Sequence, residues 1–304
     1  YLAARRWALS PWMLIAVYTA AVLAVGPINL QQFDIFPAAL SLFAVLRFAS
    51  DDAIGAGVLL ALAVMTKVYP LLLAPMFVLL AWRQHRQGVT KAIVAFVMTS
   101  IVVLLPWLVR GPASLRGMLS FHAERGTHLD SVYSTIAFAA RALGLTWVNI
   151  VYNFRSWNIS GPVPDVLARI STAVLLAMLA AAYGVIYWTA RDRSDAARDV
   201  RFVGHGALVV LLVAMIASKV LSPQYLVWLT PFVPFVIGPR QRAVWAAFIV
   251  TGLLTYWLYP WRYDALLNRE TSALALLAAR NIALVATTVL AVISLRRAPV
   301  ESSP

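Results

Sequence analysis

Long apolar runs separated by short charged stretches set the first limit on what this chain can fold into. Hydrophobic residues fill 62% of the 304 positions and charged residues only 12%, whereas charged residues make up about 25% of a soluble domain. An apolar run of roughly 17–25 residues can cross the hydrocarbon core of a bilayer as a helix. The sequence therefore predicts an all-α, multi-pass cell-membrane protein in which residues 1–304 form a single integral membrane domain.

We expect about eight to ten hydrophobic segments, counting every run that is long enough, or nearly so, to cross a bilayer. They lie at about 12–28, 34–49, 53–66, 68–82, 92–109, 166–190, 202–219, 223–238, 243–259 and 273–295. The segments 53–66 and 68–82 are short and meet at Lys67-Val68-Tyr69-Pro70. Because a proline and a charge interrupt the apolar run there, we interpret the two as a hairpin of short helices or a broken helix that lines a cavity.

Short basic clusters fall on one side of the membrane if the segments alternate in direction. These clusters contain Arg5, Arg6, Arg47, Arg83, Arg86, Lys91, Arg191, Arg193, Arg198, Arg201, Arg240, Arg242, Arg296 and Arg297. The positive-inside rule makes that side cytoplasmic and places the C-terminus there. The extracytoplasmic face then receives the long polar stretch at about 110–165. Within it, 114–122 and 131–143 carry apolar groups at helical spacing, so we expect interfacial helices on this face.

The formal net charge of +13 does not indicate nucleic-acid binding, because the basic residues follow the membrane topology. The lipid bilayer is the expected partner. Cysteine is absent, which excludes disulfides and thiolate metal sites. Only a loop could bring His122, Glu124 and His128 together, and their spacing matches no metal motif. We therefore expect neither a metal nor a cofactor.

The densest group of ionisable side chains lies in residues 121–135. A charge at mid-depth in a bilayer costs about 2.5–3.5 kcal/mol on insertion scales, so this stretch belongs in water or in a polar cavity. We predict that Arg125 binds an anionic ligand through its planar fork of donors, and that His122 or Asp130 contacts a hydroxyl group. The alternative is a solvated loop in which Asp130 and Ser131 start the following helix.

Two further polar positions lie beside apolar runs. Lys67, next to Tyr69 and Pro70, must snorkel, pair with an acid or bind an anion, and the proline break favours a cavity wall. Asp34 lies at the start of an apolar segment. The helix dipole would stabilise this carboxylate whatever its role, so a purely structural interpretation stays open.

A third polar stretch joins two apolar segments and contains Lys219. Pro223 suits the first turn of a helix with Ser222 as its cap, which would leave Gln224 and Tyr225 at the positive end of the helix dipole. Such an end attracts phosphate. Capping chemistry alone is the alternative.

Other polar residues have structural interpretations. Arg262 and Asp264 are typical of a surface ion-pair cluster. Arg280 lies inside the last segment, within snorkelling reach of the outer face. His205 lies near the cytoplasmic end of its segment, and we expect it to be structural.

With these residues in view, the chain resembles glycosyltransferase family 87, a family of membrane enzymes of the GT-C superfamily that use polyprenyl-phosphate sugars. The matching stretches, in the family's order, are Gln32-Phe33-Asp34-Ile35-Phe36-Pro37, Thr66-Lys67-Val68-Tyr69-Pro70-Leu71-Leu72-Leu73, His122-Ala123-Glu124-Arg125-Gly126-Thr127-His128-Leu129-Asp130-Ser131 and Ser222-Pro223-Gln224-Tyr225-Leu226-Val227-Trp228. Each is weak alone, and the ordered set is more specific. In the third stretch, the family commonly shows Leu-Gln-Ile-Glu-Ser where this chain has Thr-His-Leu-Asp-Ser. This chain therefore keeps an acidic residue and a serine at the last two positions.

The resemblance implies a GT-C-like bundle that transfers a sugar, expected to be mannose, from a polyprenyl-phosphate donor to a glycolipid or cell-envelope glycan. Transfer would invert the sugar carbon at the extracytoplasmic face, with a carboxylate as general base on the acceptor hydroxyl. Arg125, Lys67 and Lys219 would stabilise the phosphate. The resemblance also implies substrate-binding roles for Tyr69, His122, Ser131, Gln224 and Tyr225.

The family's catalytic Asp lies in a first outer loop that follows an initial membrane helix. Nothing in this sequence corresponds to them, so the resemblance implies a segment upstream of Tyr1. Asp34 or Asp130 would be the catalytic base only if the chain is complete. Two other functions stay open: a lipid or glycolipid transporter or flippase, suggested by the broken helices, and a non-catalytic membrane subunit.

Overall fold

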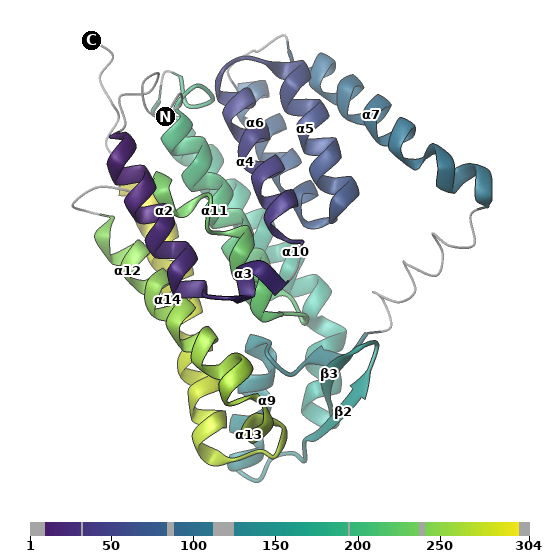
Figure 1. The fold of residues 1–304 in the computed structure, drawn as a ribbon, viewed down its shortest axis with the longest axis vertical. Coiled ribbons are helices and arrows are strands. Elements are labelled where there is room, and N and C mark those ends of the chain that lie inside the picture. The colour runs from purple at the N-terminus through teal and green to yellow at the C-terminus, as the bar shows by residue number, and fades with distance from the viewer. Residues whose placement is uncertain are drawn as a thin grey trace.

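A computed structural model describes residues 10–31, 33–83, 88–111, 125–193, 195–236 and 241–297, which form a largely helical body (Figure 1). The α-helices are α2 (Pro11–Val25), α3 (Ile28–Gln31), α4 (Ile35–Ala49), α5 (Ala53–Thr66), α6 (Ala74–Arg83), α7 (Val89–Arg110), α9 (Val132–Ala142), α10 (Pro162–Ala190), α11 (Val200–Ala217), α12 (Arg242–Tyr256), α13 (Tyr263–Leu267) and α14 (Thr271–Arg297). The elements η1 (Tyr69–Leu73), η2 (Pro223–Trp228) and η3 (Val233–Phe235) are 3₁₀ helices, and η4 (Trp257–Trp261) is a π-helical turn.

Membrane-length helices are present, as the sequence predicts. Five helices of the described ranges are long and apolar enough to cross a bilayer: α7, α10, α11, α12 continued by η4, and α14. Four shorter apolar helical stretches accompany them, at Pro11–Val25, Ile35–Ala49, Ala53–Thr66 and Tyr69–Arg83. The chain is therefore a membrane protein with several apolar helices, while the larger segment count and the orientation remain predictions.

Helix α11 lies at the centre of the core. Almost all of its residues are buried, and it packs against α10, α14 and α4. Gly204 permits a close approach here, because a Cβ atom at that position would lie 2.4 Å from the ring of Phe235. The chain after α11 can therefore fold back against the helix instead of crossing the membrane again.

The end of the molecule away from the α4–α5 turn carries a small sheet with order β1-β3-β2 (Figure 1). The strands are β1 (Thr127–His128), β2 (Asn149–Asn153) and β3 (Ser156–Ser160), all paired antiparallel. Strands β2 and β3 form a hairpin whose two-residue turn, Phe154 and Arg155, has positive φ angles of 49° and 54°. Both central residues of a type I′ turn have positive φ, and such turns match the twist of paired strands.

The structure corrects two expectations and supports a third. Residues 223–238 were expected to form a membrane segment, but the described part is the two short turns η2 and η3. The sheet was not expected. The break at Lys67 is confirmed: α5 ends at Thr66, and η1 and α6 follow as separate elements. The expected helix at 131–143 is α9, while 114–122 lies outside the described residues.

Candidate active site

A cavity of about 290 Å³ opens between η1, α10, the end of α11 and η2. Its polar and aromatic lining consists of Tyr69 of η1, Ser171 and Thr172 of α10, Ser218 and Lys219 after α11, and Tyr225 and Trp228 of η2. The remaining lining is mostly aliphatic. A cavity of this size, largely apolar and with a few convergent polar groups, is typical of a small-molecule site.

Asp34, Lys67 and Trp228 form a buried polar cluster behind the cavity wall. Lys67 Nζ lies 2.6 Å from Asp34 Oδ1, and the indole N–H of Trp228 donates to the same oxygen. The Asp34 side chain is 1% exposed and that of Lys67 26% exposed. The break after α5 brings this lysine to the start of α4. Asp34 and Lys67, which the sequence nominated separately, therefore form one ion pair.

Three aromatic rings stack beside this ion pair. The Trp228 ring is stacked between Tyr69 and Tyr225, with centroid distances of 3.9 Å to each. Lys67 Nζ lies 5.3 Å from the Trp228 ring centroid and 5.5 Å from that of Tyr225. Planar faces near a cation and a cavity provide a surface on which an apolar sugar face or an isoprenoid chain can rest.

Arg125 and Lys219 place two positive charges close to the cavity. Burial lowers the pKa of Arg125, although a guanidinium remains charged in a protein. Burial, and then the nearby charge of Arg125, lowers the pKa of Lys219. In the described part of the chain, Arg125 Nε is buried and has no hydrogen-bond partner. Two cations near one another, with a donor directed at no protein acceptor, form an arrangement that an anionic ligand would stabilise.

The backbone ties Arg125 to the cavity. His128 N donates to the carbonyl oxygen of Lys219 at 2.9 Å, so strand β1 is fixed to the chain segment that lines the cavity. Burial raises the pKa of Tyr225, while the positive charge of Arg125 acts in the opposite direction. The charge of Arg125 therefore acts on both Lys219 and Tyr225.

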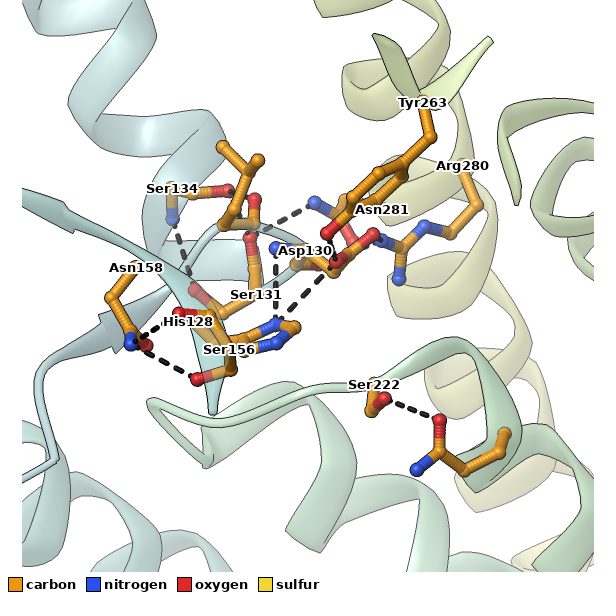
Figure 2. Close-up of polar contacts among 12 residues, drawn as sticks. His128, Asp130, Ser131, Ser134, Ser156, Asn158, Ser222, Tyr263, Arg280 and Asn281 are labelled. Atoms are coloured by element: carbon orange, nitrogen blue, oxygen red, sulfur yellow. Dashed lines mark hydrogen bonds and ion pairs between the residues drawn. The ribbon is translucent and has the colours of Figure 1, made fainter. Parts of the chain in front are cut away.

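Ser222 and Pro223 occupy the cap and first-turn positions that the sequence predicted, but the expected capping bond and α-helix are absent from this described segment. Ser222 makes no capping hydrogen bond, and its hydroxyl instead donates to Gln224 Oε1 at 2.5 Å (Figure 2). The following residues form the six-residue turn η2 rather than an α-helix. Gln224 and Tyr225 thus lie near the cavity because of this turn, without the strong helix dipole that the sequence suggested.

Asp130 lies in a separate buried network, shown in Figure 2. Its side chain is 0% exposed. The Tyr263 hydroxyl donates to Asp130 Oδ2 at 3.0 Å, and Arg280 Nη2 donates to the backbone oxygen of Asp130 at 2.7 Å and lies 3.4 Å from Oδ1. Burial, followed by the charge of Asp130, raises the pKa of Tyr263. Arg280 therefore pairs inside the protein, which corrects the expectation that it snorkels to the surface.

Ser131 and Asn281 extend this network along α9 and α14. Ser131 is the N-cap of α9 and accepts a hydrogen bond from Ser134 N at 3.2 Å. Asn281 Nδ2 donates to the Ser131 carbonyl at 3.0 Å and to Thr135 Oγ1 at 2.7 Å. Asp130 and Ser131 thus have the helix-start role that the sequence left open as the alternative to ligand contact.

His128 joins the two groups of residues. Its ring is almost fully buried, and its Nδ1 accepts a hydrogen bond from Asp130 N at 3.3 Å (Figure 2). Burial lowers the pKa of His128 to about 4, an effect that the nearby carboxylate of Asp130 opposes. The ring is therefore neutral at pH 7, with Nδ1 available as the acceptor.

The sequence nominated most of the residues that meet here and missed several others. Tyr69, Lys219 and Tyr225 line the cavity, whereas His122 lies outside the described residues. Trp228, Ser171, Thr172 and Tyr263 were not nominated as site residues. Arg280 and Asn281 stood out as polar residues inside an apolar segment, but Arg280 was interpreted as a snorkelling residue rather than as part of a buried network. In the ranges that the structure describes, no group of three His, Asp or Glu side chains is placed to share a metal ion.

Comparison with known proteins gives one match. The model of glycosyltransferase family 87 matches residues 1–218. Searches of curated proteins and of solved structures find no match. The matched range contains Asp34, Lys67, Tyr69 and Arg125, and ends just before Lys219.

Proposed function

Because the chain belongs to glycosyltransferase family 87, we propose that its cavity at Tyr69, Lys219, Tyr225 and Trp228 is the active site of a membrane glycosyltransferase. In this proposal the donor is a polyprenyl-phosphate hexose, with mannose the favoured sugar. The acceptor is a glycolipid or a cell-envelope glycan, and the site faces the extracytoplasmic side. The apolar lining suits the lipid part of the donor, and the two nearby cations suit its phosphate.

The observation that carries the proposal is the pair of cations, Arg125 and Lys219, beside a cavity of about 290 Å³. When the bond between the sugar carbon and the phosphate oxygen breaks, negative charge develops on the leaving phosphate. Donors already fixed in position stabilise that charge more in the transition state than in the ground state. Arg125 is the better candidate for direct contact, because its buried Nε has no hydrogen-bond partner within the described ranges.

A base must accept the proton of the acceptor hydroxyl as its oxygen forms the new bond to the sugar carbon. Of the two carboxylates nominated by the sequence, and on the condition that the base lies within these 304 residues, we assign this role to Asp34. Its Oδ1 is held by Lys67 and Trp228, and its Oδ2 has no hydrogen-bond partner in the described part of the chain. Both carboxylate oxygens of Asp130 already lie near cationic or hydroxyl groups of the protein. Because Asp34 Oδ2 is buried, neighbouring side chains must move before an acceptor can reach it.

The transfer is expected to proceed with inversion of configuration at the sugar carbon. The acceptor oxygen attacks from the side of Asp34, the phosphate leaves toward Arg125 and Lys219, and Asp34 gains the proton. The positive charge of Lys67 holds the carboxylate in place before the reaction. The stacked rings of Tyr69, Trp228 and Tyr225 would order the substrate between the two charged groups.

A transfer assay on the full-length protein tests this proposal. Membranes containing the protein receive radiolabelled polyprenyl-phosphate mannose and a glycolipid extract, and labelled product is separated by chromatography. We expect Arg125→Ala to lower transfer by a factor of about 10²–10³, in the range seen when one transition-state donor is removed. Arg141→Ala is the matched control, because Arg141 is an exposed arginine on α9. Equal activity of the two variants would remove Arg125 from the mechanism.

A further inference from the structure

A second and larger cavity, of about 410 Å³, lies between α5, α6 and α7. We call it the α5–α7 groove. Its floor is made by small residues of α5, including Ala53, Ala56 and Gly57, and its walls carry larger apolar side chains such as Phe77 of α6 and Phe96 of α7. The small side chains of α5 leave room for this cavity.

The packing of α7 keeps this groove open. Helix α7 packs closely along α5 and only slightly against α6. At Gly57 a Cβ atom would lie 2.3 Å from the carbonyl oxygen of Ala92, so glycine is required for α7 to approach this closely. In Figure 1 α7 extends away from the rest of the helices. No residue of its membrane-length stretch, Val89–Trp107, is fully buried in the protein, so the side of α7 away from α5 would face the hydrocarbon of a bilayer.

One end of the groove is charged. Asp51 and Arg198 line it there, and Arg198 donates to Asp51 Oδ2 and, at 3.0 Å, to Asp195 Oδ2. The side chain of Arg198 is 60% exposed and that of Asp51 is 42% exposed. Exposed charges of both signs belong at the level of lipid headgroups, whereas the apolar floor belongs at the depth of the acyl chains. The groove therefore has the polarity of an amphiphile along its length.

The charged end is far from the candidate active site. Asp34 and Asp51 flank opposite ends of α4, a helix of 15 residues, which is about 22 Å long at 1.5 Å per residue. A donor whose phosphate lies at Arg125 cannot also place that phosphate at Arg198. A lipid bound with its headgroup at Arg198 would therefore be a different molecule from the sugar donor.

We propose that the α5–α7 groove is a binding site for one acyl chain of a membrane phospholipid whose headgroup lies at Arg198 and Asp51. The phospholipid comes from the leaflet next to the α4–α5 turn. Charges of both signs at this end favour a zwitterionic headgroup, with its phosphate toward Arg198 and its ammonium toward Asp51. The bound chain fills the space between α6 and α7 and so supports the position of α7.

A matched pair of substitutions on α7 tests the proposal. Ile93 lines the groove and is 48% exposed, whereas its neighbour Val94 does not line it and is 54% exposed. The full-length protein, Ile93→Trp and Val94→Trp are purified in mild detergent, and the phospholipid retained per protein is measured by mass spectrometry. We expect Ile93→Trp to retain about tenfold less phospholipid, because the new ring occupies the groove, and Val94→Trp to retain as much as the parent.

The outcomes are decisive because lipid retention is measured independently of sugar transfer. Equal retention in Ile93→Trp and Val94→Trp would contradict the proposal, as would recovery of a polyprenyl phosphate instead of a phospholipid from the parent protein. Should Ile93→Trp fail to give folded protein by thermal melting, Val78→Trp replaces it, since Val78 lines the groove from α6 and is exposed. Retention of phospholipid by folded Val78→Trp at the level of the parent would then overturn the proposal.

Discussion

Asp130 and Arg280 are 150 positions apart in the sequence, and Arg280 Nη2 donates to the backbone oxygen of Asp130 at 2.7 Å inside the protein. This contact joins the start of α9 to the middle of α14. Both side chains are at most 3% exposed, so the pair lies in a region of low dielectric. A buried ion pair of this kind is costly to break, even where its net contribution to stability is small.

Removing only one member of this pair should destabilise the protein. In Arg280→Met, Asp130 loses a hydrogen bond to its carbonyl and the charge opposite its carboxylate, and we expect a loss of about 3–5 kcal/mol in the free energy of unfolding. The double variant Asp130→Asn/Arg280→Met removes both charges and should recover most of that loss. Thermal or denaturant unfolding in detergent measures both. A double variant no more stable than Arg280→Met would mean that the charges are not coupled.

Trp228 should affect Asp34 through its indole N–H. Trp228→Phe keeps an aromatic ring between Tyr69 and Tyr225 but removes the donor to Asp34 Oδ1. Loss of a hydrogen bond to a charged group costs about 1.5–3 kcal/mol. We expect a stability loss of that size together with reduced transfer. Tyr187→Phe is the control, because it removes a polar group from an aromatic residue of α10 that does not line the cavity. An equal effect of both substitutions would argue against the Asp34 contact.

His128 should make the protein sensitive to mild acid. Its folded pKa of about 4 lies below the ordinary value of 6.5, so the folded state disfavours the charged ring. Stability due to the neutral ring is complete above pH 6.5 and is lost as the pH falls toward 4, by up to about 3 kcal/mol. The neighbouring charges are those of Asp130, Arg125 and Arg280.

The variant His128→Asn isolates this effect. An asparagine oxygen can still accept the N–H of Asp130, but it does not titrate. The free energy of unfolding is measured for both proteins between pH 7 and about 4, the range set by the two pKa values. We expect the difference between them to shift in favour of the variant as the pH falls. A difference that does not change with pH would contradict burial of a neutral His128.

The sequence predicted the apolar helices well because length and hydropathy are local properties. The break at Lys67 was also predictable, since a charge and a proline interrupt an apolar run. The turns of residues 223–236 were not, because their path depends on packing against α11, where Gly204 admits Phe235. The hairpin β2–β3 was missed although Asn149–Asn153 contains the strand-forming residues Ile150, Val151 and Tyr152 in a row, a weak signal beside the membrane helices.

The sequence predicted which residues belong to the candidate site better than it predicted how those residues pair. Lys67 and Asp34 each appeared as a polar residue at the edge of an apolar run, but only the fold shows that they pair. The role of Arg280 could not be read from one sequence, because a snorkelling arginine and a buried one look alike until the partner is known. Asp130 illustrates the converse: its position in a polar stretch suggested a ligand contact, yet its oxygens are directed at Tyr263 and Arg280.

The most direct test of the account compares the two carboxylates in the full-length enzyme. Transfer of labelled sugar from a polyprenyl-phosphate donor is measured for Asp34→Asn and for Asp130→Asn/Arg280→Met, each normalised to the amount of folded protein. We predict that Asp34→Asn lowers the rate by a factor of about 10²–10⁴, the usual contribution of a general base, while the double variant stays within about tenfold of the parent, because its pair only holds the fold. Parent-like transfer by Asp34→Asn would contradict the assignment of Asp34 as the base at this cavity.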